Sequence, residues 1–109
     1  MILGETENGY PTIQLEPSLE PFCEFLRACH TTASSKHIVE TVDRVLCGNL
    51  ASTTIWQDYA QLKLSCTNQL ATVCIDNLVT AEEENAEMNL AQFRELAETW
   101  KNHVVRLRR

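Results

Sequence analysis

A regular apolar repeat occupies the last third of the chain. Its members recur at alternating intervals of four and three residues: Ala86, Leu90, Phe93, Ala97, Trp100, Val104 and Leu107. Because an α-helix turns once in about 3.6 residues, this spacing places every member along one side of a helix. Such a stripe needs a neighbouring helix to remove it from water. We therefore expect a long C-terminal helix with coiled-coil-like packing.

Residues that form turns are scarce outside the N-terminal segment. The 109 residues include three glycines and three prolines, and Gly4, Gly9, Pro11 and Pro17 all precede residue 18. An all-β fold needs many turns, and the remaining sequence has few residues that favour them. The sequence therefore predicts an all-α fold, a small helical bundle of about four helices, two short and two long.

The N-terminal segment, residues 1–17, differs in composition from the rest. Asn8-Gly9 is a hairpin signal, and a turn there would bring the first residues back toward Ile13. An isolated two-stranded hairpin is only marginally stable in water. We therefore expect a flexible or extended N-terminal arm over residues 1–17 and a helical bundle domain over residues 18–109.

Two short helices are expected after this arm. Ser18 can cap the first, whose buried side chains would be Leu19, Phe22, Leu26 and Cys29. Ser34 or Ser35 can cap the second, and Gly48 would end it. The inward-facing side of this second helix would consist of Ile38, Val39, Val42, Val45 and Leu46.

Two long helices complete the predicted bundle. Thr54 and Gln57 have the spacing of a capping box at the start of the third. Thr80 and Glu83 repeat that spacing at the start of the fourth, unless the third helix continues through. The apolar stripe of the third helix would consist of Ile55, Tyr59, Leu62, Cys66, Leu70, Val73 or Cys74, and Leu78.

Charge and cysteine usage limit the possible partners and compartments. The net charge of −6 argues against general affinity for nucleic-acid backbones or anionic membranes. The five cysteines are odd in number and irregularly spaced, which disfavours a disulfide framework, and the first residues lack the basic start of a signal peptide. The longest uncharged stretch, Val45 to Gln57, is too short for a membrane span. We expect an intracellular protein, cytoplasmic or nuclear.

No pattern in the sequence predicts catalysis or metal binding. Cys23, Cys29, His30 and His37 are close in sequence, but their spacing differs from that of zinc modules. A Cys29–histidine pair lacks a neighbouring oxyanion hole or orienting third group. Phosphate-binding and hydrolase motifs are absent. We therefore expect no cofactor, no metal and no enzymatic activity.

The first functional hypothesis is a non-catalytic protein–protein interaction module, a small subunit or adaptor. It would bind a protein partner or a second copy of itself, because two short helices cannot cover two long ones completely. The expected contact residues combine the C-terminal stripe with two aromatic residues near the start of the third helix: Leu90, Phe93, Ala97, Trp100, Val104, Leu107, Trp56 and Tyr59.

Two alternatives remain open at this point. One is a small-ligand-binding or regulatory bundle with an internal pocket lined by Phe22, Phe25, Cys66, Cys74, Phe93 and Trp100. The other concerns the basic C-terminal residues Lys101, Arg106, Arg108 and Arg109. These cations complement the helix macrodipole, and a contact with nucleic acid is the weaker interpretation.

Overall fold

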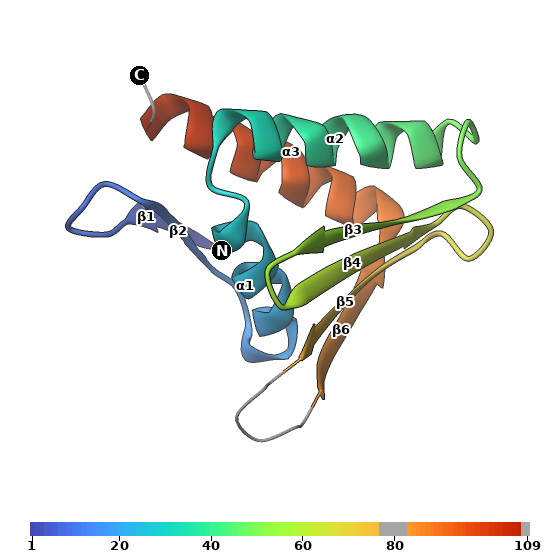
Figure 1. Ribbon diagram of the computed structural model, residues 1–109, viewed down its shortest axis with the longest axis horizontal. Helices are drawn as coiled ribbons and strands as arrows, with labels where there is room; N and C mark the ends of the chain where they lie inside the picture. The colour runs from blue at the N-terminus through green and yellow to red at the C-terminus, as the bar shows by residue number, and fades with distance from the viewer. Residues whose placement is uncertain (77–82, 108–109) are drawn as a thin grey trace.

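The chain folds as a mixed α/β structure, so the predicted all-α helical bundle is wrong (Figure 1). The computed structural model describes residues 1–76 and 83–107. Two strands, a short 3₁₀ turn and two helices come first, then four strands and a long helix. In chain order the elements are β1 (Ile2–Glu5), β2 (Pro11–Gln14), the 3₁₀ turn η1 (Pro17–Leu19), α1 (Glu20–Ala28), α2 (Thr32–Leu46), β3 (Ser52–Gln57), β4 (Ala60–Ser65), β5 (Leu70–Asp76), β6 (Glu83–Asn89) and α3 (Leu90–Leu107).

Strands β3 to β6 form one antiparallel sheet in the order β3-β4-β5-β6. Two short turns without glycine connect the first three strands, and each uses a residue with a positive backbone angle. Asp58 has φ 52° between β3 and β4, and Gln69 has φ 54° before β5. Side chains alternate between the two faces of a strand, so this register gives the sheet one apolar and one polar face.

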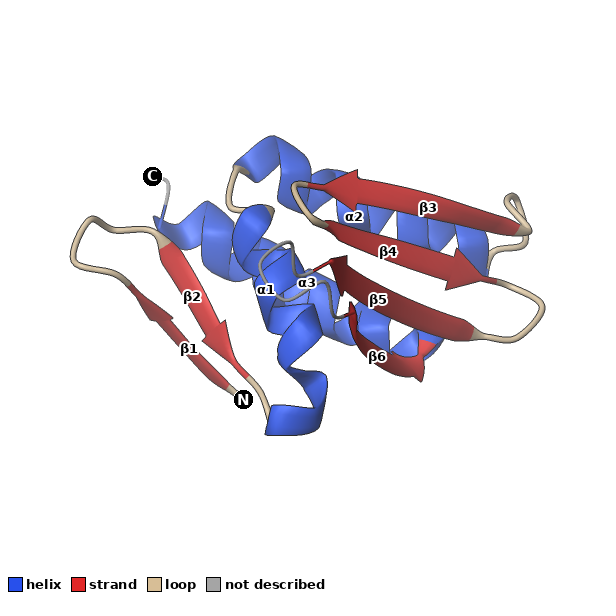
Figure 2. Ribbon diagram, turned by 60° about the horizontal axis from the view of Figure 1, so that its bottom comes forward, coloured by secondary structure: helices blue, strands red, loops and turns tan. Residues whose placement is uncertain are grey.

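The described helices lie on the apolar face of this sheet, and the polar face is open (Figure 2). Helix α1 contacts β4, β5 and β6, and α3 contacts β5 and β6. Helix α2 packs along α3. The largest fully buried side chains come from all of these layers: Ile13, Phe22, Phe25, Leu26, Ile38, Val42, Val45, Leu62, Leu64, Leu90, Phe93 and Trp100.

Polar contacts fix the antiparallel arrangement of α2 and α3. The Arg94 guanidinium donates to both carboxylate oxygens of Asp43, at 2.9 and 3.2 Å, and to Glu98 at 3.1 Å. The buried Trp100 indole donates to the carbonyl of Cys29, the residue that follows α1, at 3.0 Å and so ties α3 to the end of α1. The geometry of the bidentate Arg94–Asp43 pair, rather than the strength of a half-exposed ion pair, favours this register of α2 and α3.

The N-terminal residues form a hairpin of β1 and β2, in which Leu3 pairs with Ile13. Ile13 is 2% exposed and belongs to the core. On the opposite strand, the carbonyl of Gly4 accepts a hydrogen bond from Nε2 of the buried His103 at 2.7 Å. Gly9 adopts the positive φ of 83° that the loop between the strands requires. The hairpin is therefore held by contacts with the helical layer.

The predicted third helix is wrong, because its residues form β3, β4 and β5. A stripe at intervals of three and four fits part of this region, but burial follows a period of two. Leu62 and Leu64 are both buried, with the exposed Lys63 between them. Thr53, Thr54 and Ile55 are β-branched and favour strands. Leu78 and Thr80, which belonged to the predicted helical pattern, lie outside the described residues.

The predicted fourth helix begins later than expected and makes no coiled coil. Ala86 lies in strand β6, and α3 starts at Leu90, where the side-chain oxygen of Asn89 accepts from the Ala91 amide at 2.8 Å. From Leu90 to Val104 the stripe is buried as predicted, and Leu107 is half-buried. Its partners are α2, the sheet and the hairpin instead of one matching helix, so the coiled-coil expectation is wrong.

The two short helices are confirmed as helices. Helix α1 buries Phe22 and Leu26, and Cys29 is buried directly after its end. The helix follows a short 3₁₀ turn that contains Ser18. Helix α2 is capped by Thr31, three residues earlier than the nearer of the two expected serines, in a capping box with Ser34. Gly48 follows the helix with φ 81°. Among the described residues, no helix is long and apolar enough to cross a membrane.

Two substitutions separate the observed strand from the predicted helix. Leu64→Ala should destabilise the fold by about 2–5 kcal/mol, because it leaves a cavity in the core. Tyr59→Ala should change stability by about 0.5 kcal/mol or less, because the side chain is exposed. Urea unfolding of both variants measures the difference. If these residues formed the predicted helix, Tyr59→Ala would be the more destabilising substitution, because the helical stripe includes Tyr59 and omits Leu64.

Candidate protein-binding surface

The eight predicted contact residues lie in different parts of the structure. Five are between 0% and 1% exposed inside a single chain and present no surface: Leu90, Phe93, Ala97, Trp100 and Val104. Leu107 is half-buried at the end of α3. Trp56 and Tyr59 are 64% and 63% exposed. The structure therefore separates the C-terminal stripe, which is core, from two aromatic side chains that lie on the surface.

Trp56 and Tyr59 lie at one end of the sheet, on and beside the β3–β4 turn. Trp56 is in β3, paired with Gln61, on the open polar face. Tyr59 follows Asp58 in the turn, and its carbonyl accepts a hydrogen bond from the Asp76 amide at 3.1 Å. The backbone of the turn is thus tied to β5, while both aromatic rings remain in solvent. Exposed aromatic side chains on a backbone that is held in this way are typical of a binding surface.

The open face of the sheet is polar across all four strands. One cross-strand row consists of Thr54, Lys63, Thr72 and Glu87, and the next of Trp56, Gln61, Cys74 and Asn85. Opposite charges on this face are not neighbours: the exposed Lys63 lies on β4 and the exposed Glu87 on β6, with β5 between them. The face thus offers hydrogen-bonding groups and one large aromatic side chain.

Strand β3 is an edge strand, and its outward backbone groups are available. The Cys66 amide donates to the Ala51 carbonyl at 2.8 Å. In an antiparallel pair, the backbone groups of successive residues point alternately toward the partner strand and away from it, so this bond fixes which residues of β3 face β4. Thr53 and Ile55 then point their amides and carbonyls toward β4, and Thr54 and Trp56 point theirs away from the sheet. No backbone hydrogen bond from another described residue reaches this outward side.

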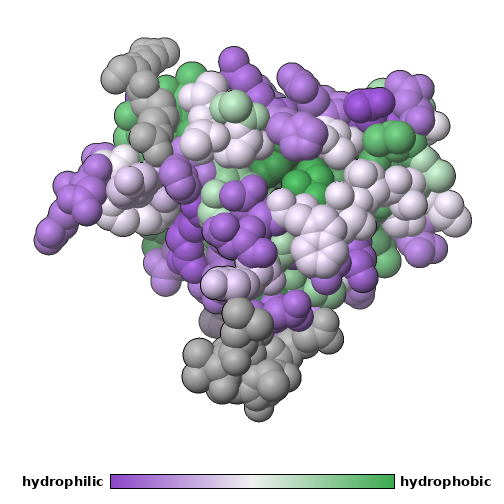
Figure 3. Space-filling model, in the orientation of Figure 1, coloured by the Kyte–Doolittle hydropathy of each residue, from purple (hydrophilic) through white to green (hydrophobic). Residues whose placement is uncertain are grey.

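A groove of about 380 Å³ lies between this edge and helix α2. Figure 3 shows hydrophobic atoms at the bottom of a hollow on this side of the molecule, between hydrophilic ones. Helix α2 contributes His37, Thr41 and Arg44, and the other lining residues are Leu50, Thr53, Thr54, Ile55, Trp56 and Gln57. The groove therefore has an apolar floor, a strand edge on one side and a basic helix face on the other.

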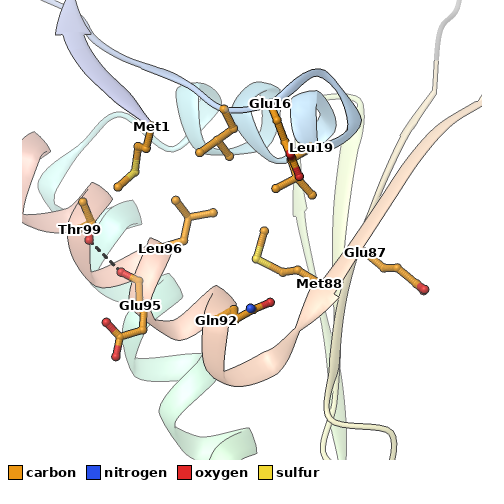
Figure 4. Close-up of a pocket in the computed structure, with 10 residues that line it drawn as sticks. Met1, Glu16, Leu19, Glu87, Met88, Gln92, Glu95, Leu96 and Thr99 are labelled. Carbon is orange, nitrogen blue, oxygen red and sulfur yellow. Dashed lines mark hydrogen bonds between the residues drawn. The ribbon is translucent and has the colours of Figure 1, made fainter.

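A second groove, of about 650 Å³, lies between η1, β6 and α3 (Figure 4). Its walls are apolar, and three carboxylates stand around it. The apolar residues are Met1, Leu15, Leu19, Met88 and Leu96, and the acids are Glu16, Glu87 and Glu95, with Gln92 and Thr99 beside them. None of the six residues of the predicted internal pocket lines either groove, because the four large aromatic ones are packed in the core.

The cysteines and histidines considered for chemistry do not converge. Cys23 and Cys29 are buried, and burial raises the pKa of both thiols, that of Cys29 to about 12. The His30 ring packs against Tyr10, with ring centroids 5.3 Å apart, whereas His37 lies exposed on α2. Within residues 1–76 and 83–107, no three histidine, cysteine or acidic side chains come close enough to hold a metal ion.

Trp56 and Tyr59 can be identified from the sequence, but the strand edge and the basic helix face beside it cannot. His37 and Arg44 are seven residues apart on α2 and lie on the same side of that helix. Their relation to β3 is a tertiary contact, which periodicity does not reveal. The run Ser52-Thr53-Thr54-Ile55 was the available signal for a strand, because such residues favour extended backbone.

Thiol labelling tests the burial of Cys29. At pH 8, iodoacetamide should modify the exposed Cys47 and leave Cys29 unmodified, because a thiol with a pKa of about 12 contains little thiolate. The Cys29 thiol has a lower pKa in the unfolded chain than in the fold, so it ionises there at a lower pH. The free energy of unfolding should therefore fall as the pH rises from about 9 toward 12. Peptide mass spectrometry measures the labelling. Equal labelling of both residues in the folded protein would contradict the structure.

No protein-family model, no curated protein and no solved structure matches this chain. A functional inference therefore has to come from the surface that the chain itself presents. That surface consists of the open sheet face, the free edge of β3, the exposed pair Trp56 and Tyr59, and the two grooves.

Proposed function

We propose that this chain is a non-catalytic protein-binding domain, and that its contact surface is the β3 end of the open sheet. The observation that carries the proposal is the exposure of Trp56 and Tyr59, 64% and 63%, at the uncovered end of the four-stranded sheet. Four other large aromatic side chains, Phe22, Phe25, Phe93 and Trp100, are fully buried. Burial of the exposed aromatic pair against a partner would contribute several kcal/mol, about 1.5–3 for each large side chain.

The surroundings of the aromatic pair support a protein partner. Polar groups surround Trp56 on the sheet face, as in the polar rim of an interface around a central anchor. The chain's net charge of −6 and the presence of Glu87 and Asp76 on the same face disfavour a nucleic acid. The partner is a different protein or a second copy of this chain.

A second candidate function is the binding of a small ligand in the groove between η1, β6 and α3. One observation favours it: the volume of about 650 Å³ and the apolar walls lie within the range of ligand sites. Native mass spectrometry of the purified protein distinguishes the two candidates. A mass above that of the bare chain, lost on Leu96→Trp in the wall of the groove, would favour the small ligand.

Photo-crosslinking in the native source tests the protein-binding proposal. A photoreactive phenylalanine at position 56 should crosslink to one protein, whereas the same residue at position 2 should not. Ile2 is the matched control because it is also 64% exposed and lies on strand β1, away from the sheet. With the purified partner, Trp56→Ala and Tyr59→Ala should each weaken binding about tenfold or more, and Ile2→Ala should have little effect. Equal crosslinking at both positions would contradict the proposal.

A further inference from the structure

Resting on the proposed function, we infer that the partner contributes an extended, acidic segment that adds to the edge of β3 as a fifth strand, alongside helix α2. In this arrangement, backbone hydrogen bonds provide the attachment, Trp56 covers one side of the added strand, and Arg44 with His37 receives the acidic groups. Three properties of the β3 edge and the groove carry the inference.

The first property is the direction of the backbone groups. Two independent hydrogen bonds agree on which neighbouring strand each backbone amide faces: the Cys66 amide donates to the Ala51 carbonyl, and the Asp76 amide donates to the Tyr59 carbonyl. Both place the amides of Ala60, Leu62 and Leu64 toward β3 and those of their odd-numbered neighbours toward β5. The amides and carbonyls of Ser52, Thr54 and Trp56 consequently form a row of free donors and acceptors at the outer edge.

The second property is the lack of protection along this edge. The six residues of β3, Ser-Thr-Thr-Ile-Trp-Gln, include no charge and no proline, and their register with β4 is continuous. Natural edge strands usually carry such features because they block unwanted pairing. At about 3.3 Å per residue, β3 offers about 20 Å of edge. An extended segment of about six residues therefore matches its length.

The third property is the charge of the groove beside the edge. Arg44 and His37 line it, and no carboxylate from the described part of the chain does. Arg44 is exposed, and Glu40 and Lys36 lie exposed on neighbouring positions of α2 but outside the lining. In a chain of net charge −6, counted with neutral histidines, a groove whose described lining includes the Arg44 guanidinium and no carboxylate favours an acidic occupant.

The same charge pattern disfavours a second copy of this chain as the occupant. If two β3 edges paired about a two-fold axis, each groove would meet an identical one, because such an interface uses the same patch twice. Each copy would then bring its Arg44 guanidinium into the interface, and the identical groove of the other copy has no carboxylate in its described lining to pair with it. A foreign acidic segment supplies that carboxylate, so it is the occupant we propose.

Random peptides of about eight residues, displayed and selected on the immobilised full chain, provide the probe. The selected sequences should contain Asp or Glu and should avoid proline. Synthetic versions methylated at alternate backbone nitrogens should fall into two classes. Methylation of the amides that face β3 should weaken binding about tenfold or more, and methylation of the intervening amides should have little effect.

Two pairs of protein variants complete the experiment. Thr54→Pro removes an outward-facing amide that makes no hydrogen bond to β4. This variant should therefore bind the selected peptides about tenfold more weakly than Thr54→Ala does. Arg44→Glu should lower the affinity for these peptides about fivefold at low salt. Lys36→Glu should leave the affinity unchanged, because it makes the same charge change on the same helix but outside the groove. Circular dichroism confirms that each variant is folded, and the methylated peptides test the same bonds without any change to the protein.

Several outcomes would overturn the inference. One is a selection that yields no binder, and another is peptides that bind regardless of backbone methylation. A dimer in sedimentation equilibrium that Thr54→Pro converts to a monomer would assign the edge to a second copy of this chain. If a partner crosslinked at position 56 binds Thr54→Pro and Thr54→Ala equally well, protein binding through Trp56 stands and strand addition is wrong.

Discussion

One-sided burial of a four-stranded sheet is the constraint on which the rest of this structure depends. Leu62, Leu64 and Val73 point toward the helices, and Lys63 and Thr72 point away from them. Because the strand period is two, every side chain in the sheet is assigned to one face or the other by this register. Helices α1 and α3 cover the apolar face, and the polar face stays open. The open face and the free edge of β3 are direct consequences of that arrangement.

Helices in the first half of the chain follow from local sequence, and this part could be predicted. Apolar residues at helical spacing, a polar residue able to cap and Gly48 after the end are sufficient for α2. The hairpin signal at Asn8-Gly9 corresponds to a real loop between β1 and β2, although its order depends on Ile13 entering the core. The contacts that determine α2 are close in sequence, whereas those that order the hairpin come from the helical layer.

The middle of the chain could not be predicted in the same way, because its determining contacts are pairings between strands. Ile55, Leu62, Leu70 and Val73 fit a helical stripe, and neither turn contains the glycine that usually marks a hairpin. Asp58 and Gln69 take the left-handed conformation instead. The C-terminal stripe shows a related limit. Its spacing identified the buried face of α3, from Leu90 to Val104, but not which elements would cover it.

The candidate surface combines local and non-local features. Trp56 and Tyr59 can be predicted as contact residues from the sequence, whereas the groove between β3 and α2 arises only when Arg44 and His37 are brought beside the strand. An edge strand beside an aromatic side chain and a basic helix face can bind both the backbone and the side chains of a partner. The backbone groups set the geometry of an added strand, and the side chains select its sequence.

Amide hydrogen exchange, followed by NMR along β3, tests the free edge most directly. The amides of Thr53 and Ile55 face β4 and should be protected, whereas those of Thr54 and Trp56 face outward and should exchange at least about a hundredfold faster. A selected peptide, when bound, should slow the exchange of the second pair. Equal protection of all four amides in the free chain would contradict an open strand edge, because it would mean a helix or a covered edge.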